Sequence, residues 1–264
     1  MRQLLQYETR KLFSAKSFWI CCGALAAMTL MGLVSAKISQ VVGTHALTSV
    51  PDTSNIPAAF FDHLSGRFLL VSSLHSMVPA ALSILIAILV CFDFSQKTVR
   101  NVIAMGYSRA NIFFSKLLVC MLAAVIYSCA NVLFACALGS MLWGFGGTVT
   151  VQIFMTLVTQ LLLIFSMTSG YLMFAIVIRN PGIAIVVCIF GSSIIGYTFS
   201  LFDAIVQSFG LNIAISSYHL PKLLASISIL DASNSQLIKA AICAVLSIIV
   251  LNVISVITFC KRDA

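Results

Sequence analysis

Six long apolar stretches, separated by shorter polar segments, make up most of the chain. Each is 19 to 28 residues long, and about 20 residues of helix are enough to cross the hydrocarbon core of a bilayer. None shows the period-two alternation that is typical of membrane β-strands. The pattern therefore predicts an all-α polytopic membrane protein, with one six-span domain over 1–264. The expected spans are 18–36, 68–92, 117–142, 151–178, 182–202 and 237–259.

Prolines are expected to interrupt this pattern at two places. Pro79 lies inside the second stretch, and Asn180-Pro181 separates the fourth stretch from the fifth. Proline lacks a backbone N–H and clashes with the preceding turn. We therefore expect a kink or a helix end at both positions.

The polar segment 93–116 also has an internal pattern. Gly106 is a plausible helix stop and Ser108 a plausible N-cap for the helix that follows. The segment is therefore predicted to hold a short helix across the membrane face, then a turn, then a return into the membrane. Val99, Val102 and Ile103 would give the short helix an apolar side that could seat in a partner's groove.

The few charged residues indicate an orientation. The chain is 61% hydrophobic and 8% charged, whereas a soluble domain is about a quarter charged, so a soluble globular fold is excluded. Of its 15 Lys and Arg, eleven fall on the side of the two termini and four on the other. The positive-inside rule then places both termini in the cytosol. The net charge of +8 is thus an orientation signal, and we expect no nucleic-acid partner.

The predicted spans contain little reactive chemistry. No Asp, Glu, Lys or Arg lies deep in any of them, and His75 is the one ionisable candidate. We interpret His75 as an interhelical hydrogen-bonding residue, with a proton site as the alternative. Protease, hydrolase and phosphate-loop motifs are missing. His45, His63 and His219 lack metal-ligand spacing, and the nine cysteines are read as small packing residues. We expect no catalytic residue, metal or cofactor on this chain.

Residues 1–17 predict a basic amphipathic helix that lies in the membrane interface. Leu4 and Leu12 share one face, and Glu8 can pair with Lys11 at a spacing of three. The alternative is a positive flank that only sets orientation. The first span could be a secretory signal, but its length and the charged residues before it favour a retained helix. The candidate residues of this segment are Tyr7, Glu8, Arg10 and Lys11.

Motifs in these two segments carry a family resemblance. The run Tyr7-Glu8-Thr9-Arg10-Lys11-Leu12 places Glu before basic residues, and His219-Leu220-Pro221 lies in the last outer segment. The chain resembles the permease subunits of type-2 ATP-binding-cassette exporters, in particular the small six-span permeases beside bacitracin- and lantibiotic-type peptide-resistance ATPases. Many relatives have Gly where Lys97 stands. The matching positions of the loop are Asp93-Phe94, Lys97-Thr98, Arg100, Gly106, Ser108-Arg109 and Ser115-Lys116.

The resemblance implies a role for each segment. Residues 1–17 would form an elbow helix, 93–116 a coupling segment that seats in a nucleotide-binding subunit, and 203–236 an outer re-entrant segment that includes His219 and Pro221. It also implies a separate ATPase subunit that holds ATP and Mg, and a second permease, identical or related, in a bacterial cytoplasmic (plasma) membrane. The coupling residues implied are Asp93, Lys97, Thr98, Arg100, Val102, Ile103, Arg109 and Lys116.

The predicted function is that of the membrane half of an ATP-driven exporter. It would move a hydrophobic or amphipathic substrate outward, such as a peptide antibiotic or a lipid-like compound, without being an enzyme itself. The uncharged interior and the absence of an ATP-binding motif agree with this prediction. One alternative is a non-transporting immunity or scaffold protein that binds a peptide. Another is an ion-coupled carrier, for which His75 would have to matter.

Overall fold

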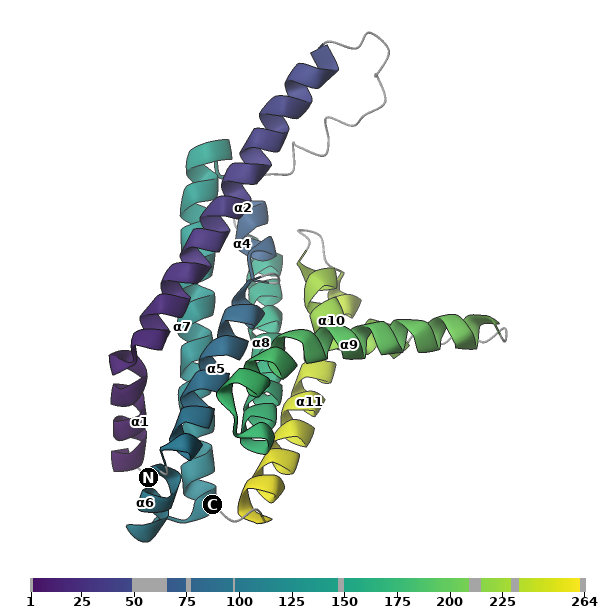
Figure 1. The fold of residues 1–264 in the computed structure, drawn as a ribbon. Helices are drawn as coiled ribbons and strands as arrows, with labels where there is room; N and C mark the ends of the chain where they lie inside the picture. The colour runs from purple at the N-terminus through teal and green to yellow at the C-terminus, as the bar shows by residue number, and fades with distance from the viewer. Residues whose placement is uncertain are drawn as a thin grey trace.

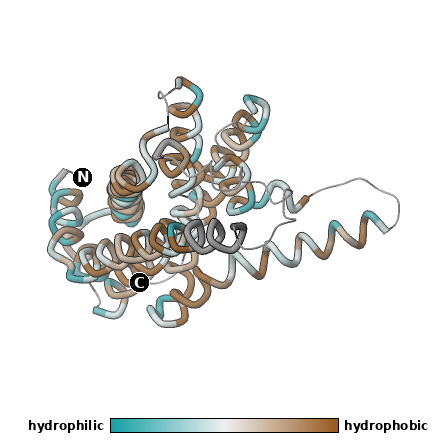
Figure 2. Tube along the Cα trace, turned by 90° about the horizontal axis from the view of Figure 1, so that it is seen from above, coloured by the Kyte–Doolittle hydropathy of each residue, from teal (hydrophilic) through white to brown (hydrophobic). Residues whose placement is uncertain are grey.

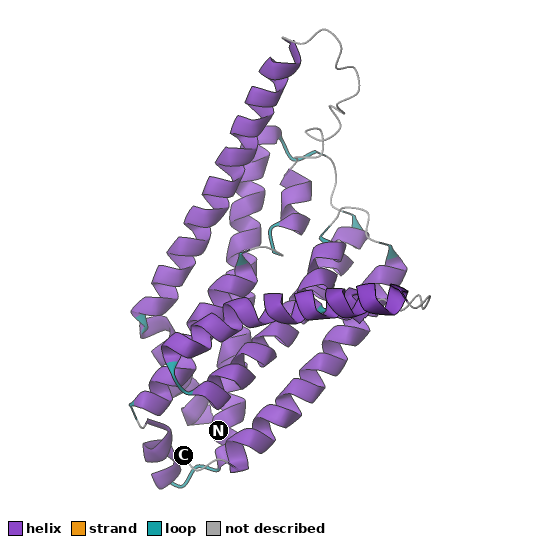
Figure 3. Cartoon of the chain, turned by 45° about the vertical axis from the view of Figure 1, so that its right-hand side comes forward, coloured by secondary structure: helices purple, strands orange, loops and turns teal. Residues whose placement is uncertain are grey.

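The computed structural model describes residues 2–48, 66–74, 77–96, 98–146, 150–208, 215–228 and 233–261. Within these ranges every regular element is a helix and none is a strand (Figure 3), which confirms the all-α prediction. In chain order the helices are α1 (Arg2–Ser14), α2 (Lys16–Thr48), α4 (Gly66–Ser72), α5 (Val78–Ser95), α6 (Thr98–Ala104), α7 (Arg109–Trp143), α8 (Val151–Ile178), α9 (Pro181–Ser208), the 3-10 helix η1 (Ile215–Tyr218), α10 (Leu220–Ile227) and α11 (Asn234–Lys261).

Six of these helices are long and apolar enough to cross a membrane, which confirms the number of spans expected. They are α5, α7, α8, α9, α11 and the part Lys16–Ile38 of α2. Figure 2 shows hydrophobic positions along the length of the long helices. Several helices run past the apolar stretch that predicted them, because a helix propagates through its own backbone hydrogen bonds once it has formed. Thus α7 begins at Arg109 rather than at 117.

The second expected span, 68–92, is divided in two. Helix α4 ends at Ser72, and α5 begins at Val78 with Pro79 in its first turn. Proline cannot donate the backbone hydrogen bond that a continuous helix would need there, so the expectation for Pro79 is confirmed as a helix boundary. His75 lies in the interval, outside the described residues.

Side chains of neighbouring helices cap the carbonyl groups at this break. Gln160 of α8 donates to the Val71 carbonyl over 2.8 Å, and Asn131 of α7 donates to the Ser73 carbonyl over 3.0 Å. Irregular backbone at membrane depth is tolerated where protein satisfies its polar groups. Gln160 and Asn131 therefore help to hold the interrupted helix in place.

Helices α5, α7 and α8 form the centre of the bundle. Helices α1 and α2 pack on α7, α11 packs on α8, and α9 packs on α5 and α8. The ribbon places α6 and both chain termini at one end, here called the termini end (Figure 1). Helix α9 runs across the bundle and projects sideways from it, and α10 lies on the other side of α9 from the termini (Figure 1). Most of α9, α11 and the part Lys16–Ile38 of α2 is left uncovered by the described residues of this chain.

Candidate coupling site

Four charged side chains from three helices meet at the termini end. Lys116 Nζ of α7 lies 3.1 Å from Glu8 Oε1 of α1 and also pairs with Asp93 of α5. Lys11, one turn along α1 from Glu8, pairs with the other carboxylate oxygen of Asp93. Two carboxylates and two ammonium groups leave the set with no net charge. We call these residues, Glu8, Lys11, Asp93 and Lys116, the ion-pair cluster.

Three of the four members of the ion-pair cluster are buried, and Lys11 is half-buried. Asp93 is 2% exposed, Lys116 6% and Glu8 8%. The void beside them measures about 20 Å³, which is room for about one water molecule. Burial lowers the pKa of Lys11, and the nearby Lys116 lowers that pKa further. Charges this deep are paired because an unpaired one would be costly, so the cluster fixes α1 to α5 and α7.

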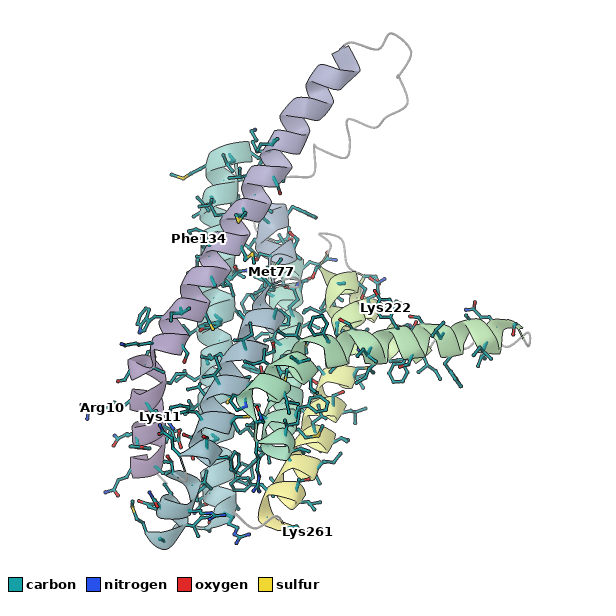
Figure 4. The ribbon with its side chains drawn as sticks, in the orientation of Figure 1. Arg10, Lys11, Met77, Phe134, Lys222 and Lys261 are labelled. Atoms are coloured by element: carbon teal, nitrogen blue, oxygen red, sulfur yellow. The ribbon has the colours of Figure 1, made fainter. Side chains whose placement is uncertain are left out.

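Helix α1 turns its expected apolar face inward. Leu4 and Leu12 are buried, which confirms the face predicted for them, and Glu8 lies between them on that face. The pair expected within α1, Glu8 with Lys11, is not formed, because each residue pairs with another helix instead. Figure 4 shows Lys11 pointing toward the bundle and Arg10 pointing away from it. Tyr7 is also exposed.

The turn between α6 and α7 follows the local signals of its sequence. Helix α6 ends at Ala104, and Gly106 has a φ of 90°, a conformation that favours glycine. The Ser108 hydroxyl accepts a hydrogen bond from the Asn111 amide over 3.3 Å at the start of α7. The helix stop at Gly106 and the cap at Ser108 are both confirmed.

The apolar side of α6 faces this chain rather than a partner. Val99 and Val102 are buried in the core, and Ile103 packs against it. A short helix covers its apolar residues with the nearest hydrophobic surface, which here is its own bundle. Arg100 lies on the exposed side of α6, and Thr98 begins the helix half-buried. Lys97 lies outside the described residues.

A groove of about 360 Å³ lies beside α6. The end of α5, α6 and the α8–α9 turn form its walls, and Arg100 and Arg179 both line it. The Arg179 guanidinium lies 4.9 Å from the centre of the Phe94 ring. The backbone of Arg179 has a φ of 57° at the point where α8 ends. Helix α8 ends at Ile178 and α9 begins at Pro181, so the helix end expected at Asn180-Pro181 is present. We call this feature the basic groove.

Arg179 was not among the residues expected in a site. The sequence gives little indication of a site at Arg179, which is simply the one cation in the three-residue turn 179–181. Its position beside α6 depends on how α8 packs against α5, which no local pattern reports. The basic groove would suit an acidic surface of another protein, because complementary charge guides association.

Arg109 has a different environment. Its guanidinium donates to the Cys260 carbonyl over 3.0 Å and so joins the start of α7 to the last turn of α11. Carbonyl groups at a helix C-terminus attract cations. Arg109 therefore links the two helices within this chain.

The two residues expected in the outer re-entrant segment lie far from the basic groove. His219 occupies the N-cap position of α10, and Pro221 lies in the first turn of that helix. The His219 ring contacts α9, with Phe199 edge-on at 6.2 Å between ring centres. The structure therefore groups the candidate residues at two places, one at the termini end and one around α10.

Comparisons with known proteins fit a membrane bundle of this kind. The model of a family described as ABC-2 family transporter protein matches residues 4–206. The match runs from α1 into α9, and it includes the ion-pair cluster and the basic groove. A comparison with curated proteins finds no match, and neither does a comparison with solved structures.

Proposed function

The chain belongs to the ABC-2 family of transporter proteins, and from this premise we propose that it exports a hydrophobic or amphipathic substrate. As a multi-pass permease subunit of an ABC transporter, it would depend on a separate ATPase subunit for energy. The substrate would be a peptide antibiotic or a lipid-like compound, as in the bacitracin- and lantibiotic-type permeases that the sequence resembles. The location would be a bacterial cytoplasmic membrane, with the termini end in the cytosol.

The basic groove is the observation that carries this proposal. It combines exposed Arg100 with Arg179 beside the helix that the resemblance assigns to coupling. An ATPase with an acidic surface would dock there, and Val102, which is buried, and Ile103, which packs against the core, would transmit its movement into the bundle. Asp93 and Lys116 would take part in coupling without contacting the ATPase. Helix α5 precedes α6 in the chain, and the ion-pair cluster joins α5 to α1 and α7, so a movement of α6 would be passed to those helices.

A second permease would complete the transporter. Helix α9 projects from the bundle (Figure 1), and among its described residues only Ala184, Cys188 and Asp203 are buried. In a membrane this apolar surface is covered by lipid or by another protein chain. We expect α9 to pack against an identical or related chain.

Charge reversal tests the docking surface directly. The full chain would be produced with the ATPase encoded beside it, and Arg100→Glu and Arg179→Glu would be compared with Lys239→Glu. Lys239 is exposed at the first turns of α11, at the opposite end of that helix from the termini. We expect the groove variants to reduce copurification of the ATPase by about tenfold or more, and Lys239→Glu to leave it unchanged. Equal copurification in all three variants would contradict the docking site.

Transport is tested separately in vesicles that contain both subunits. Outward movement of substrate should require hydrolysable ATP and should fall with the groove variants. Protection against a peptide that persists without nucleotide would instead indicate a non-transporting immunity or scaffold protein.

A further inference from the structure

A second cavity, distant from the basic groove, lies among α8, α9, α11 and the η1–α10 segment. Its volume is about 440 Å³, within the range of about 300–1,000 Å³ that is usual for small-molecule sites. Its walls are mainly apolar. Residues that line it include Ser166, Phe174, Ser192, His219, Leu246 and Val250.

One polar atom in this cavity has no hydrogen-bond partner among the residues that the structure describes. The Ser166 hydroxyl of α8 is fully buried, and no described residue forms a hydrogen bond with it. Leaving a buried hydroxyl unpaired is unfavourable. Gly170, one turn further along α8, also lines the cavity and adds no side chain to its wall. A ligand in the cavity could supply the missing hydrogen bond.

The cavity is not suited to a charged ligand. The described side chains that line it include no Asp, Glu, Lys or Arg, and His219 is their one group that titrates near neutral pH. Burial lowers the pKa of His219, although a hydrogen bond to the Ser192 main chain opposes that change. The lowered pKa of His219 favours its neutral form, and the ligand should be uncharged where it contacts the walls.

The lining of the cavity includes exposed apolar side chains of two candidate membrane spans. Among the lining residues, Leu246 and Val250 of α11 and Ile195 and Phe199 of α9 are exposed on this chain. Exposed apolar faces of membrane-spanning helices contact hydrocarbon. A molecule dissolved in the bilayer can therefore reach these side chains without crossing water.

We propose that this cavity binds a single acyl chain of a membrane-dissolved amphiphile, joined to its head group through an ester or amide. The carbonyl oxygen of that link accepts a hydrogen bond from the Ser166 hydroxyl, and the hydrocarbon contacts Phe174, Leu246 and Val250. The inference deepens the proposed function and rests on it, because it identifies where an amphipathic substrate enters the permease. Binding itself needs neither the ATPase nor nucleotide.

Photolabelling of the full chain in lipid nanodiscs tests the site. The probe is a monoacylglycerol with a diazirine in its acyl chain, and labelled peptides are mapped by mass spectrometry. We expect labels in α8, α9 and α11 around the cavity, and we expect unlabelled monoacylglycerol to compete for them. Labels spread evenly over all lipid-facing helices, without competition, would overturn the proposal.

Two adjacent serines provide a matched pair of variants. Ser192 lines the cavity, whereas Ser193 is exposed beside it and does not. Ser192→Phe should fill the cavity and reduce labelling at least fivefold, and Ser193→Phe should leave it within twofold. Equal labelling in the two variants would contradict the site.

Ser166→Ala tests the hydrogen bond. It should weaken competition by about two- to tenfold, the value of one hydrogen bond. Thermal stability should not fall, because no described residue forms a hydrogen bond with the hydroxyl. Unchanged competition would contradict the bond to Ser166.

The photolabelling result can be separated from the test of the proposed function. Arg100→Glu should abolish ATP-driven transport and leave photolabelling intact. Labelling without any ATP-driven transport would refute the proposed function alone, and ATP-driven transport without competed labelling would refute this site alone.

Discussion

Lys116 is the residue on which the ion-pair cluster depends. It is the one member that contacts both carboxylates, Glu8 and Asp93, and it is 6% exposed. Lys11 pairs with Asp93 alone and is more exposed. Removing Lys116 would leave Glu8 without an ion-pair partner in a buried environment, whereas removing Lys11 would leave every carboxylate paired. The two lysines should therefore respond very differently to substitution.

We predict that Lys116→Met lowers the free energy of unfolding by about 3–5 kcal/mol, the usual cost of an uncompensated buried charge. Lys11→Met should cost less, and Lys16→Met, at an exposed position, should cost almost nothing. Thermal unfolding of the purified variants in detergent measures the three values. A loss for Lys116→Met no larger than for Lys16→Met would mean that the cluster does not stabilise the fold.

Gln160 should stabilise the fold because its side chain donates a hydrogen bond to the Val71 carbonyl. Gln160→Leu leaves the Val71 carbonyl without its partner at the break between α4 and α5. We expect a loss of about 1–3 kcal/mol, measured as a lower thermal midpoint. Gln6→Leu, on the exposed face of α1, is the control. If both changes have the same small effect, the break does not depend on this hydrogen bond.

At the scale of elements, α10 should make the protein sensitive to acid through His219. Burial lowers the pKa of this residue below its usual value of about 6.5. In that case the unfolded chain binds more protons below pH 6.5 than the folded one, and stability falls as the pH decreases. Lys222, on the same helix, adds to the effect.

We predict that the thermal midpoint is constant above pH 7 and falls from pH 6.5 downward. His219→Phe should remove part of this decrease, because phenylalanine fills a similar space without titrating. Unfolding measured at pH 7.5 and pH 5.0 for both proteins gives the difference. An identical decrease in the two proteins would assign the acid sensitivity to other groups.

The sequence predicted most of the elements and few of the contacts between them. Hydropathy along the chain predicted the six spans. Pro79, Gly106 and Ser108 predicted helix ends, because a helix end is determined by residues within about one turn of it. Two of the three ion pairs in the cluster join residues more than 80 positions apart. Which face of α6 is buried depends on the helices that pack against it. Those features arise from packing, on which local patterns carry no information.

At the scale of the whole molecule, α9 has two opposite sides. Ser192, Ile195 and Phe199 line the acyl-chain cavity, whereas Tyr197 and Leu201 are exposed at 74% and 65%. At 3.6 residues per turn these two sets lie on opposite sides of the helix. A second chain could therefore cover the outer side of α9 without closing the cavity.

We predict that a photoreactive benzoylphenylalanine at Tyr197 crosslinks two permease chains in the membrane. The same residue at Ile249, on the lipid-facing side of α11, should give little crosslinking. The mass of the product distinguishes an identical partner from a related one. Equal crosslinking at both positions, or none at Tyr197, would contradict pairing through α9.

The interruption before α5 has a mechanical consequence. Helix α5 is a rod of 18 residues, about 27 Å long, with α6 at one end and a break in the backbone at the other. No helical hydrogen bonding continues from α4 into α5, because α4 ends at Ser72 and α5 begins at Val78. We therefore expect a displacement of α6 to reach α5 and the ion-pair cluster without bending α4.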